Sequence, residues 1–509
     1  MKKEALSDII GELDDGLIEN APNDHVKRKR INFKRFITAA AAFVVIAAVL
    51  AAFIGIRPVR TPEPPSEETS GAVIARDASF AVVEAKYPDH GAYKNWRDSE
   101  SDLNFSKDDY KDYPITYTEK TVSNLIGYAD KNVVFSPLSL FFSLCSLAEM
   151  TENESREQIL SLLGTNSTEE LRKAAKALWL TNYGFDIPTL GEEGGISGQV
   201  NRSLSGSSFW LNADAEIDGS SDIAQTLKDN YFTSFYKGKI SDEKYSEKLR
   251  DWLSFHTGGL LGDSVKEINF SDETLFMMLN TILYQQKWTT EFDPSKNFTG
   301  AFYSNKIKSD VTFMKEQGAF GSLFFEGDRF TAYGKRTESD YMGWLWFILP
   351  NENESVASVL ESGEYKELLE AYANENYNRF TPREQGYDMY EVTASIPKFD
   401  VTSSINLKET LTSLGVTDVF SETKAEIPFI KMKNGENVYL TNASQDVRLG
   451  IDENGVSAAA ITSIEGGIGD GSNPVIKYID FVLDRPFIFV LTSANSSIPL
   501  FAGIINDPS

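Results

Sequence analysis

The feature that most constrains the fold is a buried-helix pattern followed by several strand-length apolar runs. Residues 138–150, LSLFFSLCSLAEM, are apolar on nearly all sides of a helix, which predicts a helix inside a core. Aromatic and β-branched runs follow, including NRSLSGSSFWLN, LFMMLNTILYQQKW and MGWLWFILP, and each has the length of a central strand. These runs do not alternate with helices in βαβ order. We therefore predict an α+β fold with large mixed or antiparallel sheets.

A second feature sets residues 37–56 apart from the rest. This segment, ITAAAAFVVIAAVLAAFIGI, is 20 residues long and carries no charge, which is enough for a helix to cross about 30 Å of hydrocarbon. Lysine and arginine concentrate just before it, so the N-terminus is expected inside the cell and everything after the segment outside. A cleaved signal peptide is the alternative, although the preceding residues are too many for an ordinary n-region.

The chain is therefore expected to have four parts. Residues 1–36 form a cytoplasmic tail, 37–56 a transmembrane signal anchor, 57–112 an extracellular linker and charged extension, and 113–509 a folded domain. The linker begins RPVRTPEPPSEETSG, whose prolines and acids cannot pack into a core. The expected location is the cell membrane, with a single pass and the folded domain outside.

Charge and cysteine usage limit the partners. The formal net charge of −26 falls almost wholly on the part after the span, so the surface will repel nucleic acid. Cys145 is the only cysteine and lies in an apolar run, so we expect a small buried thiol and no intramolecular disulfide. A basic-flanked anchor without disulfides suits a bacterial envelope better than a secretory pathway.

The sequence offers no convincing enzyme site. Of the three histidines, only His256 lies in the folded domain, outside the predicted tail and extension that contain His25 and His90. No GxSxG elbow accompanies it, so a surface or helix-end histidine is the simpler interpretation. Metal-binding spacings are missing as well, and GGIGDGS lacks the lysine of a phosphate-binding loop. We expect neither a cofactor nor a metal.

Five segments, in order along residues 113–509, resemble the serpin family. They are NVVFSPLSLFFSLCSLAEMTENESREQILSLLG, DWLSFHTGGLL, LNTILYQQKWTTEFDP, SIPKFDVTSSINLKETLTSLGVTDVF and DRPFIFVLTSANSSIPLFAGIINDPS. Each is similar to a family motif, and together they are highly specific. The resemblance implies a serpin-like fold with about eight or nine helices and an exposed reactive-centre loop.

A sixth segment, DENGVSAAAITS, is similar to the serpin hinge that leads into this loop. The resemblance implies a monomeric inhibitor that is not an enzyme: a serine protease attacks the loop, forms a covalent acyl-enzyme, and the N-terminal half of the loop inserts into the main sheet. One alternate set of hinge residues is uncharged and mostly small, as a strand facing the core requires. The hinge residues are Gly455, Val456, Ser457, Ala458, Ala459, Ala460, Ile461 and Thr462.

The resemblance also assigns positions that control opening of the sheet. Glu453 and Trp288 match the breach, where the hinge first enters. Four further residues match the shutter beneath the central strands: Ser136, Ser139, Asn280 and Gln445. Family members usually have histidine where this chain has Gln445, and glutamine does not titrate, so insertion should depend less on pH through this position.

The family count places the cleaved bond between Gly469 and Asp470. A shift by one residue places it between Ile468 and Gly469, and Ile464 is a third possibility. The segment from Glu453 to Asn473 has no lysine or arginine, which argues against trypsin-like targets and favours elastase-like proteases. The alternative function is a non-inhibitory surface binding protein or adhesin with the same fold.

Overall fold

The computed structural model describes residues 80–87, 114–185, 202–218, 222–239, 242–257, 276–304, 307–317, 323–338, 343–433, 435, 437–456, 475–492 and 498–509. Contacts divide the chain into two units, Met1–Glu63 and Pro64–Ser509, and every described residue belongs to the second. The anchor expected at 37–56 lies outside the described residues. Within these ranges, no helix has both the length and the apolar character that crossing a bilayer requires.

The largest sheet has eight strands and is mixed, because β7 runs antiparallel to β4 and parallel to β16. Its strands in spatial order are β1 (Ala81–Val83), β6 (Thr233–Gly238), β4 (Arg202–Asn212), β7 (Phe276–Lys287), β17 (Gly455–Val456), β16 (Asn442–Ile451) and β14 (Phe399–Asn406), with β3 (Gly184–Phe185) paired to β4.

Three smaller sheets complete the strand pairing of the described residues. The six-stranded sheet contains β10 (Leu323–Glu326), β11 (Phe330–Arg336), β12 (Trp344–Pro350), β19 (Phe487–Thr492), β20 (Phe501–Ile505) and β2 (Val133–Phe135). The four-stranded sheet contains β18 (Ile476–Val482), β13 (Met389–Pro397), β9 (Ile307–Glu316) and β8 (Phe298–Ser304). The two-stranded sheet pairs β15 (Ile430–Met432) with β5 (Ala215–Ile217).

Nine α-helices occur in the described part of the chain, in agreement with the number expected. They are α4 (Pro114–Ser123), α5 (Pro137–Met150), α6 (Asn153–Leu163), α7 (Thr168–Asn182), α8 (Ile223–Tyr231), α9 (Glu243–His256), α10 (Val356–Ser362), α11 (Tyr365–Ala373) and α12 (Leu407–Ser413). The 3-10 turns are η4 (Asn124–Tyr128), η6 (Pro294–Lys296), η7 (Tyr377–Phe380) and η8 (Asp418–Phe420). The predicted α+β class is confirmed.

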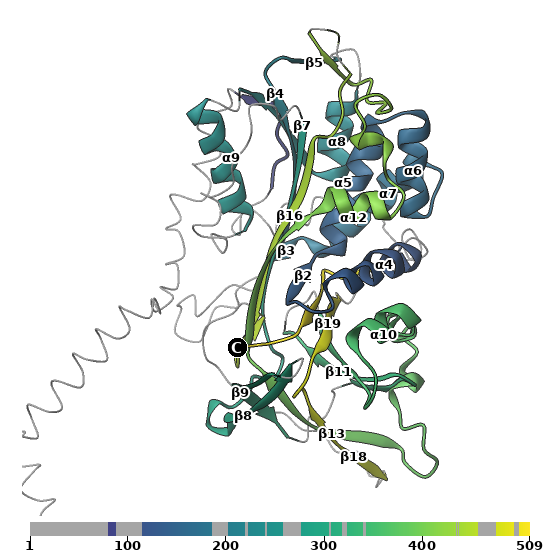
Figure 1. The fold of residues 1–509 in the computed structure, drawn as a ribbon, viewed down its shortest axis with the longest axis vertical. Helices are drawn as coiled ribbons and strands as arrows, with labels where there is room; N and C mark the ends of the chain where they lie inside the picture. Colours follow the sequence, from purple (N-terminus) through teal and green to yellow (C-terminus); the bar gives the residue numbers. More distant parts are fainter. Residues whose placement is uncertain are drawn as a thin grey trace, which may run out of the picture. The chain divides into compact units, whose positions relative to one another are not determined.

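Helix α5 is buried along its whole length, as its sequence predicts. It starts cleanly because Pro137 occupies the first turn and the Ser136 hydroxyl accepts a hydrogen bond from the Ser139 amide at 3.2 Å. In Figure 1, α5 packs on one face of the main sheet and α9 on the other, and both helices contact β4 and β7. The central strands are therefore covered on both faces.

One strand of the main sheet comes from the segment expected to be an extension. Ala81–Val83 form β1, which lies at the end of the strand order and pairs with β6. The Glu84 carboxylate accepts a hydrogen bond from Tyr236 at 2.7 Å and pairs with Lys248 of α9 at 3.0 Å. The folded domain therefore includes residues before the boundary expected at 113. A three-residue strand is too short for its periodicity to be detected in the sequence.

Candidate functional site: the opening of the main sheet

The first two hinge residues already form a strand inside the main sheet. Gly455 and Val456 make up β17, which lies between β7 and β16, and Val456 is fully buried. A Cβ at Gly455 would collide with the backbone oxygen of Gln286, so only glycine fits this close approach. Of the hinge residues, Ser457 to Thr462 lie outside the described residues, as do Ile464 and both candidate cleavage positions, Ile468–Gly469 and Gly469–Asp470.

The pairing register agrees on the two sides of β17. Val456 pairs with Gln286 of β7 and with Ile451 of β16, antiparallel in both cases. Further along, β7 and β16 pair directly and in parallel, from Met277 opposite Asn442 to Asn280 opposite Gln445. The numbering difference between a β16 residue and the β7 residue level with it is the same in both sets of pairs. The two strands therefore keep one register both where they pair directly and where β17 lies between them.

A tight turn leads from β16 into β17. The Asp452 carboxylate accepts hydrogen bonds from the amides of Asn454 at 2.8 Å and Gly455 at 3.2 Å. Trp288 closes the other side: its indole N–H donates to the Asp452 carbonyl at 2.8 Å, and its amide donates to the Asn454 carbonyl at 2.9 Å. Burial raises the pKa of the Asp452 carboxyl above its usual range, despite the two amide donors. Trp288 therefore contacts the turn that leads into β17.

Glu453 holds the same turn through its side chain. Its carboxylate forms an ion pair with Lys398 and accepts a hydrogen bond from Asn297. Burial by itself would raise the pKa of this carboxyl, but the bonds from Lys398 and Asn297 outweigh that effect, so the pKa lies below its usual value. Glu453 therefore remains ionised at neutral pH and links the turn to the segment between β13 and β14.

A buried lysine, Lys335, packs against Trp288 and Phe292. Lys335 is 3% exposed, and its ammonium lies 2.7 Å from the Glu316 carboxylate of β9. The same ammonium lies 4.2 Å from the ring centroid of Phe292 and 5.5 Å from that of Trp288. Burial lowers the pKa of Lys335, while the attraction of Glu316 opposes this shift. The Trp288 indole therefore packs near the ion pair of Lys335 and Glu316.

Ser136 and Gln445 are joined directly. The Ser136 amide donates to Gln445 Oε1 at 2.7 Å, and Gln445 Nε2 donates to the Ser136 carbonyl at 3.0 Å. Both residues are fully buried or nearly so. This two-point contact ties β16 to the start of α5 at the level where β16 still pairs with β7.

Asn280 makes different contacts from those of Ser136 and Gln445. Its side-chain oxygen accepts hydrogen bonds from Ser143 of α5 and, at 3.4 Å, from Ser207 of β4. Among the described residues, Asn280 Nδ2 has no hydrogen-bond partner. The structure thus brings Asn280 opposite Gln445 in the sheet without a bond between their side chains.

Several contacts of this region were not predicted from the sequence. Lys398, Asn297, Ser143 and Ser207 each contact an expected site residue. Lys398 lies inside the SIPKFDV motif, which signalled the segment without identifying the partner of the lysine. The two serines carry no motif, because their contacts depend on how α5 crosses the sheet.

The other candidate groups are structural. Cys145 is buried, as expected, and burial raises the pKa of its thiol well above its ordinary value. His256 ends α9 but is buried, not on the surface, and burial lowers its pKa from 6.5 to about 3. A neutral imidazole packed against Trp252 and Gly206 serves as core. No group of metal-ligating side chains occurs within the described ranges.

Comparison with known proteins identifies the class of this fold and site. A family model described as "Serpin (serine protease inhibitor)" matches residues 118–508. The chain belongs to the serpin family. Its relatives include a serine protease inhibitor of Cyanea capillata, 24% identical over 76% of this chain and 95% of the relative. Alpha-1-antiproteinase of Rattus norvegicus is also 24% identical, over 74% of this chain and 84% of the relative.

Solved structures share the fold. The native state of the thermophilic serpin tengpin matches with a TM-score of 0.63 at 22% identity, over 84% of this chain and 96% of tengpin. Thyroxine-binding globulin in complex with thyroxine matches with a TM-score of 0.60 at 20% identity, over 79% of this chain and 100% of that protein. At these identities the matches establish the fold alone.

Proposed function

We propose that this chain is a suicide inhibitor of serine proteases that acts by inserting its cleaved loop between β7 and β16. The observation that carries the proposal is β17: the hinge already lies between these strands, in a register that both neighbours share. An insertion that continues in this register lengthens an existing strand and needs no new nucleus.

The chemistry belongs to the protease, and the inhibitor supplies the trap. The protease serine attacks the carbonyl carbon of Gly469, or of Ile468 in the shifted alternative, and an ester replaces the peptide bond. The amine of the following residue leaves as the new N-terminus of the C-terminal fragment. Insertion then carries the esterified residue away before water can attack the ester.

The strand register predicts the position of each hinge residue after insertion. Continued down β7, Ala458 meets Tyr284, Ala460 meets Ile282, and Thr462 meets Asn280, while Thr462 also meets Gln445 on the β16 side. Tyr284, Ile282 and Asn280 are all buried, as are the matching residues of β16. The small uncharged set of hinge residues therefore enters the core side of the sheet, which a charged residue could not do cheaply.

The register also predicts that Thr462 lies between two polar residues after insertion. Thr462 would arrive between Asn280 and Gln445, and the Asn280 Nδ2 donor has no partner there among the described residues. The Thr462 hydroxyl can accept a hydrogen bond from this amide in the inserted state. Insertion would then satisfy a buried donor in addition to forming backbone hydrogen bonds.

Target preference remains part of the proposal. An elastase-like protease with a small apolar pocket fits Ile468 or Gly469 better than a trypsin-like protease, which requires a cation. We also propose that residues 37–56 anchor the inhibitor in a cell membrane. Resistance of the full-length chain to alkaline extraction of membranes would support the anchor, and its release would oppose it.

The test uses the full-length chain with pancreatic elastase and with trypsin. The expected product is an SDS-resistant covalent complex, together with a C-terminal fragment whose first residue identifies the cleaved bond. Cleavage without any complex, for every protease tried, would favour the alternative function, a non-inhibitory binding protein. That alternative has a precedent in the fold, since one structural relative is described as thyroxine-binding globulin with bound thyroxine.

A further inference from the structure

The terminal strand of the four-stranded sheet carries an exposed apolar strip. Three side chains are exposed along or beside β18: Tyr478 at 71%, Val482 at 38% and Tyr387 at 37%. We call these three residues the β18 strip. In the strand order, β18 lies at one end of its sheet, next to β13. Large exposed aromatic and aliphatic side chains that gather in one place mark contact surfaces.

The strand beneath the strip is held firmly. The Val475 amide donates to the Asp388 carboxylate at 2.7 Å, and the Asp388 amide donates to the Val475 carbonyl at 2.8 Å. On the inner side, Lys477 pairs with Glu326 at 2.9 Å, and Phe481 is buried. The strip is therefore preorganised, which reduces the entropy lost when a partner binds.

Two carboxylates lie beside the strip. By register, Glu391 of β13 lies next to Tyr478, and Thr393 lies next to Asp480. Asp480 shares the face of Tyr478 because side chains two apart on a strand point the same way. Lys477 lies on the opposite face of the strand, where it pairs with Glu326 and Glu384. The strip thus combines tyrosine and valine with two carboxylates.

The short chain between the candidate bond and β18 limits the distance between the bound protease and the strip. Asp470 is five residues before Val475, and at about 3.4 Å per residue the candidate bond lies within about 17 Å of Val475. A globular domain of about 220 residues has a radius of gyration of about 17 Å and hence a width of about 40 Å. A protease bound at this bond can therefore reach the start of β18.

We propose that the β18 strip is a second contact surface for the target protease and binds a basic and apolar patch beside its active-site cleft. This inference rests on the proposed inhibitory function. Tyrosines with a rigid base are frequent binding hot spots, and complementary charge raises the association rate. The strip selects the target through the encounter complex, whereas the loop sequence selects it through the pocket.

The experiment compares association rate constants of the full-length chain and its variants with whichever of elastase and trypsin the wild type traps faster. Tyr478→Ala is expected to lower the rate constant about tenfold, which corresponds to about 1.4 kcal/mol. The number of inhibitor molecules consumed per protease should not change. Tyr377→Ala is the matched control, because Tyr377 is 56% exposed and belongs to η7, outside this sheet.

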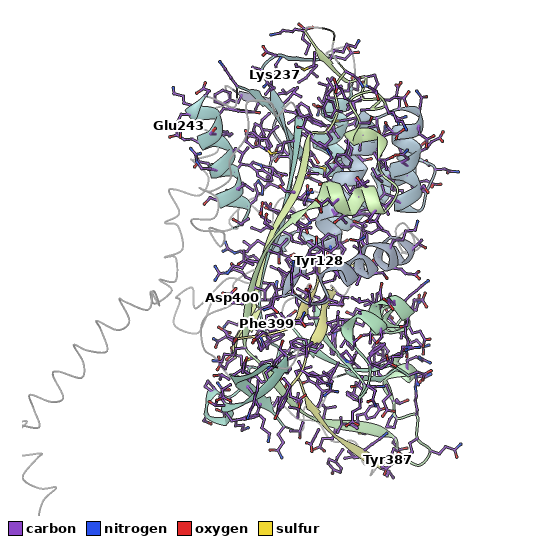
Figure 2. The ribbon with its side chains drawn as sticks, in the orientation of Figure 1. Tyr128, Lys237, Glu243, Tyr387, Phe399 and Asp400 are labelled. Atoms are coloured by element: carbon purple, nitrogen blue, oxygen red, sulfur yellow. The ribbon has the colours of Figure 1, made fainter. Side chains whose placement is uncertain are left out.

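A second pair of variants tests the charge. Glu391→Lys combined with Asp480→Lys should lower the rate constant at low salt and lose this effect at about 0.5 M salt, because the charges are screened. Glu243→Lys on α9 should have no effect, since Figure 2 shows Glu243 and Tyr387 at opposite ends of the ribbon.

Three results would overturn the inference. A Tyr478→Ala rate within twofold of the wild type would show that the strip does not contact the protease. A changed consumption of inhibitor per protease would assign Tyr478 to insertion instead. A dimer of the wild type that Tyr478→Ala dissociates would assign the strip to a second copy of the chain. Failure of the proposed function is distinct, because the wild type itself would then form no complex.

Discussion

The two edges of β7 differ sharply in how they are held. On the β4 side, ten consecutive residues pair, from Arg202 opposite Gln285 to Leu211 opposite Phe276. On the β16 side, only four residues pair, ending at Asn280 opposite Gln445, and two hinge residues then intervene at the far end. A strand that leaves the β16 edge breaks far fewer backbone hydrogen bonds. In the proposed mechanism the β16 edge of β7 is therefore the one that opens, and the Ser136–Gln445 contact lies at that edge.

The strongest test of the comparison is a charge on the inserting hinge. Ala458→Glu would bring a carboxylate between Tyr284 and Leu449, which are both buried, at a cost of several kcal/mol. We expect the yield of covalent complex to fall at least tenfold while cleavage continues. Ser472→Glu, beyond both candidate bonds, should leave the yield unchanged. Full trapping by Ala458→Glu would mean that the loop does not enter at the β16 edge.

The next largest effect is expected from loss of the Ser136–Gln445 contact. Gln445→Ala leaves the buried amide and carbonyl of Ser136 without their present partner, which should lower the stability of the native state by about 2 to 4 kcal/mol. The measurement is the midpoint of urea unfolding, with loss of inhibitory activity on storage as a second readout. Ser205→Ala, on the firmly paired β4 edge, is the control and should change the midpoint little. Equal losses in both variants would contradict the difference between the edges.

Gln445→His tests how the trapping rate depends on pH. The wild-type trapping rate should vary little between pH 6 and 8 through this contact, since glutamine does not titrate. Gln445→His should add a pH dependence in that range, because an ordinary histidine changes charge there. The comparison of the two pH profiles measures the effect. Identical profiles would mean that this contact does not limit opening.

The β4 edge has its own pH dependence, through His256 of α9. Its pKa is about 3 in the folded protein and 6.5 by its ordinary value, so between these values the unfolded chain binds a proton that the folded protein does not. Stability should therefore fall on acidification, by roughly 1 to 2 kcal/mol between pH 7 and pH 5 from this residue. The difference in urea midpoint between wild type and His256→Phe at the two pH values isolates the effect. Parallel shifts in both proteins would contradict it.

The smallest expected effect tests the register itself. Thr462→Val removes the hydroxyl that would meet Asn280 after insertion, at a cost of about 1 kcal/mol. The cleaved form should unfold at a slightly lower temperature, whereas the uncleaved form should be unchanged. Equal unfolding temperatures for cleaved wild type and cleaved variant would show that Thr462 does not reach Asn280.

Much of the fold could be predicted because its patterns are local. The buried helix α5 and the strands β4, β7 and β12 were evident from apolar runs of the right length. Residues 389–401 also have the composition of a strand, but the structure divides this run at Lys398 into β13 and β14, which belong to different sheets. The pattern is continuous, and only the pairing partners separate the two strands.

The candidate site could be predicted only in part. Family motifs pointed to Glu453, Trp288, Ser136, Ser139, Asn280 and Gln445. In the structure, Glu453 lies in the turn before β17, and Trp288 donates hydrogen bonds to this turn. The bonds themselves were not predictable. Gln445 binds the backbone of Ser136, whereas Asn280 binds Ser143 and Ser207. Such choices depend on side-chain distances of a few tenths of an ångström, which no pattern encodes.

The sequence by itself determined the family and the chemical nature of the hinge, because small uncharged side chains are a local property that any fold must accommodate. Tertiary structure decided which edge of β7 is weakly paired, which cation neutralises Glu453, and which residues stand exposed along β18. Each of these depends on strands far apart in the chain that meet in one register, and the free energy of such a contact exists only once both strands are in place.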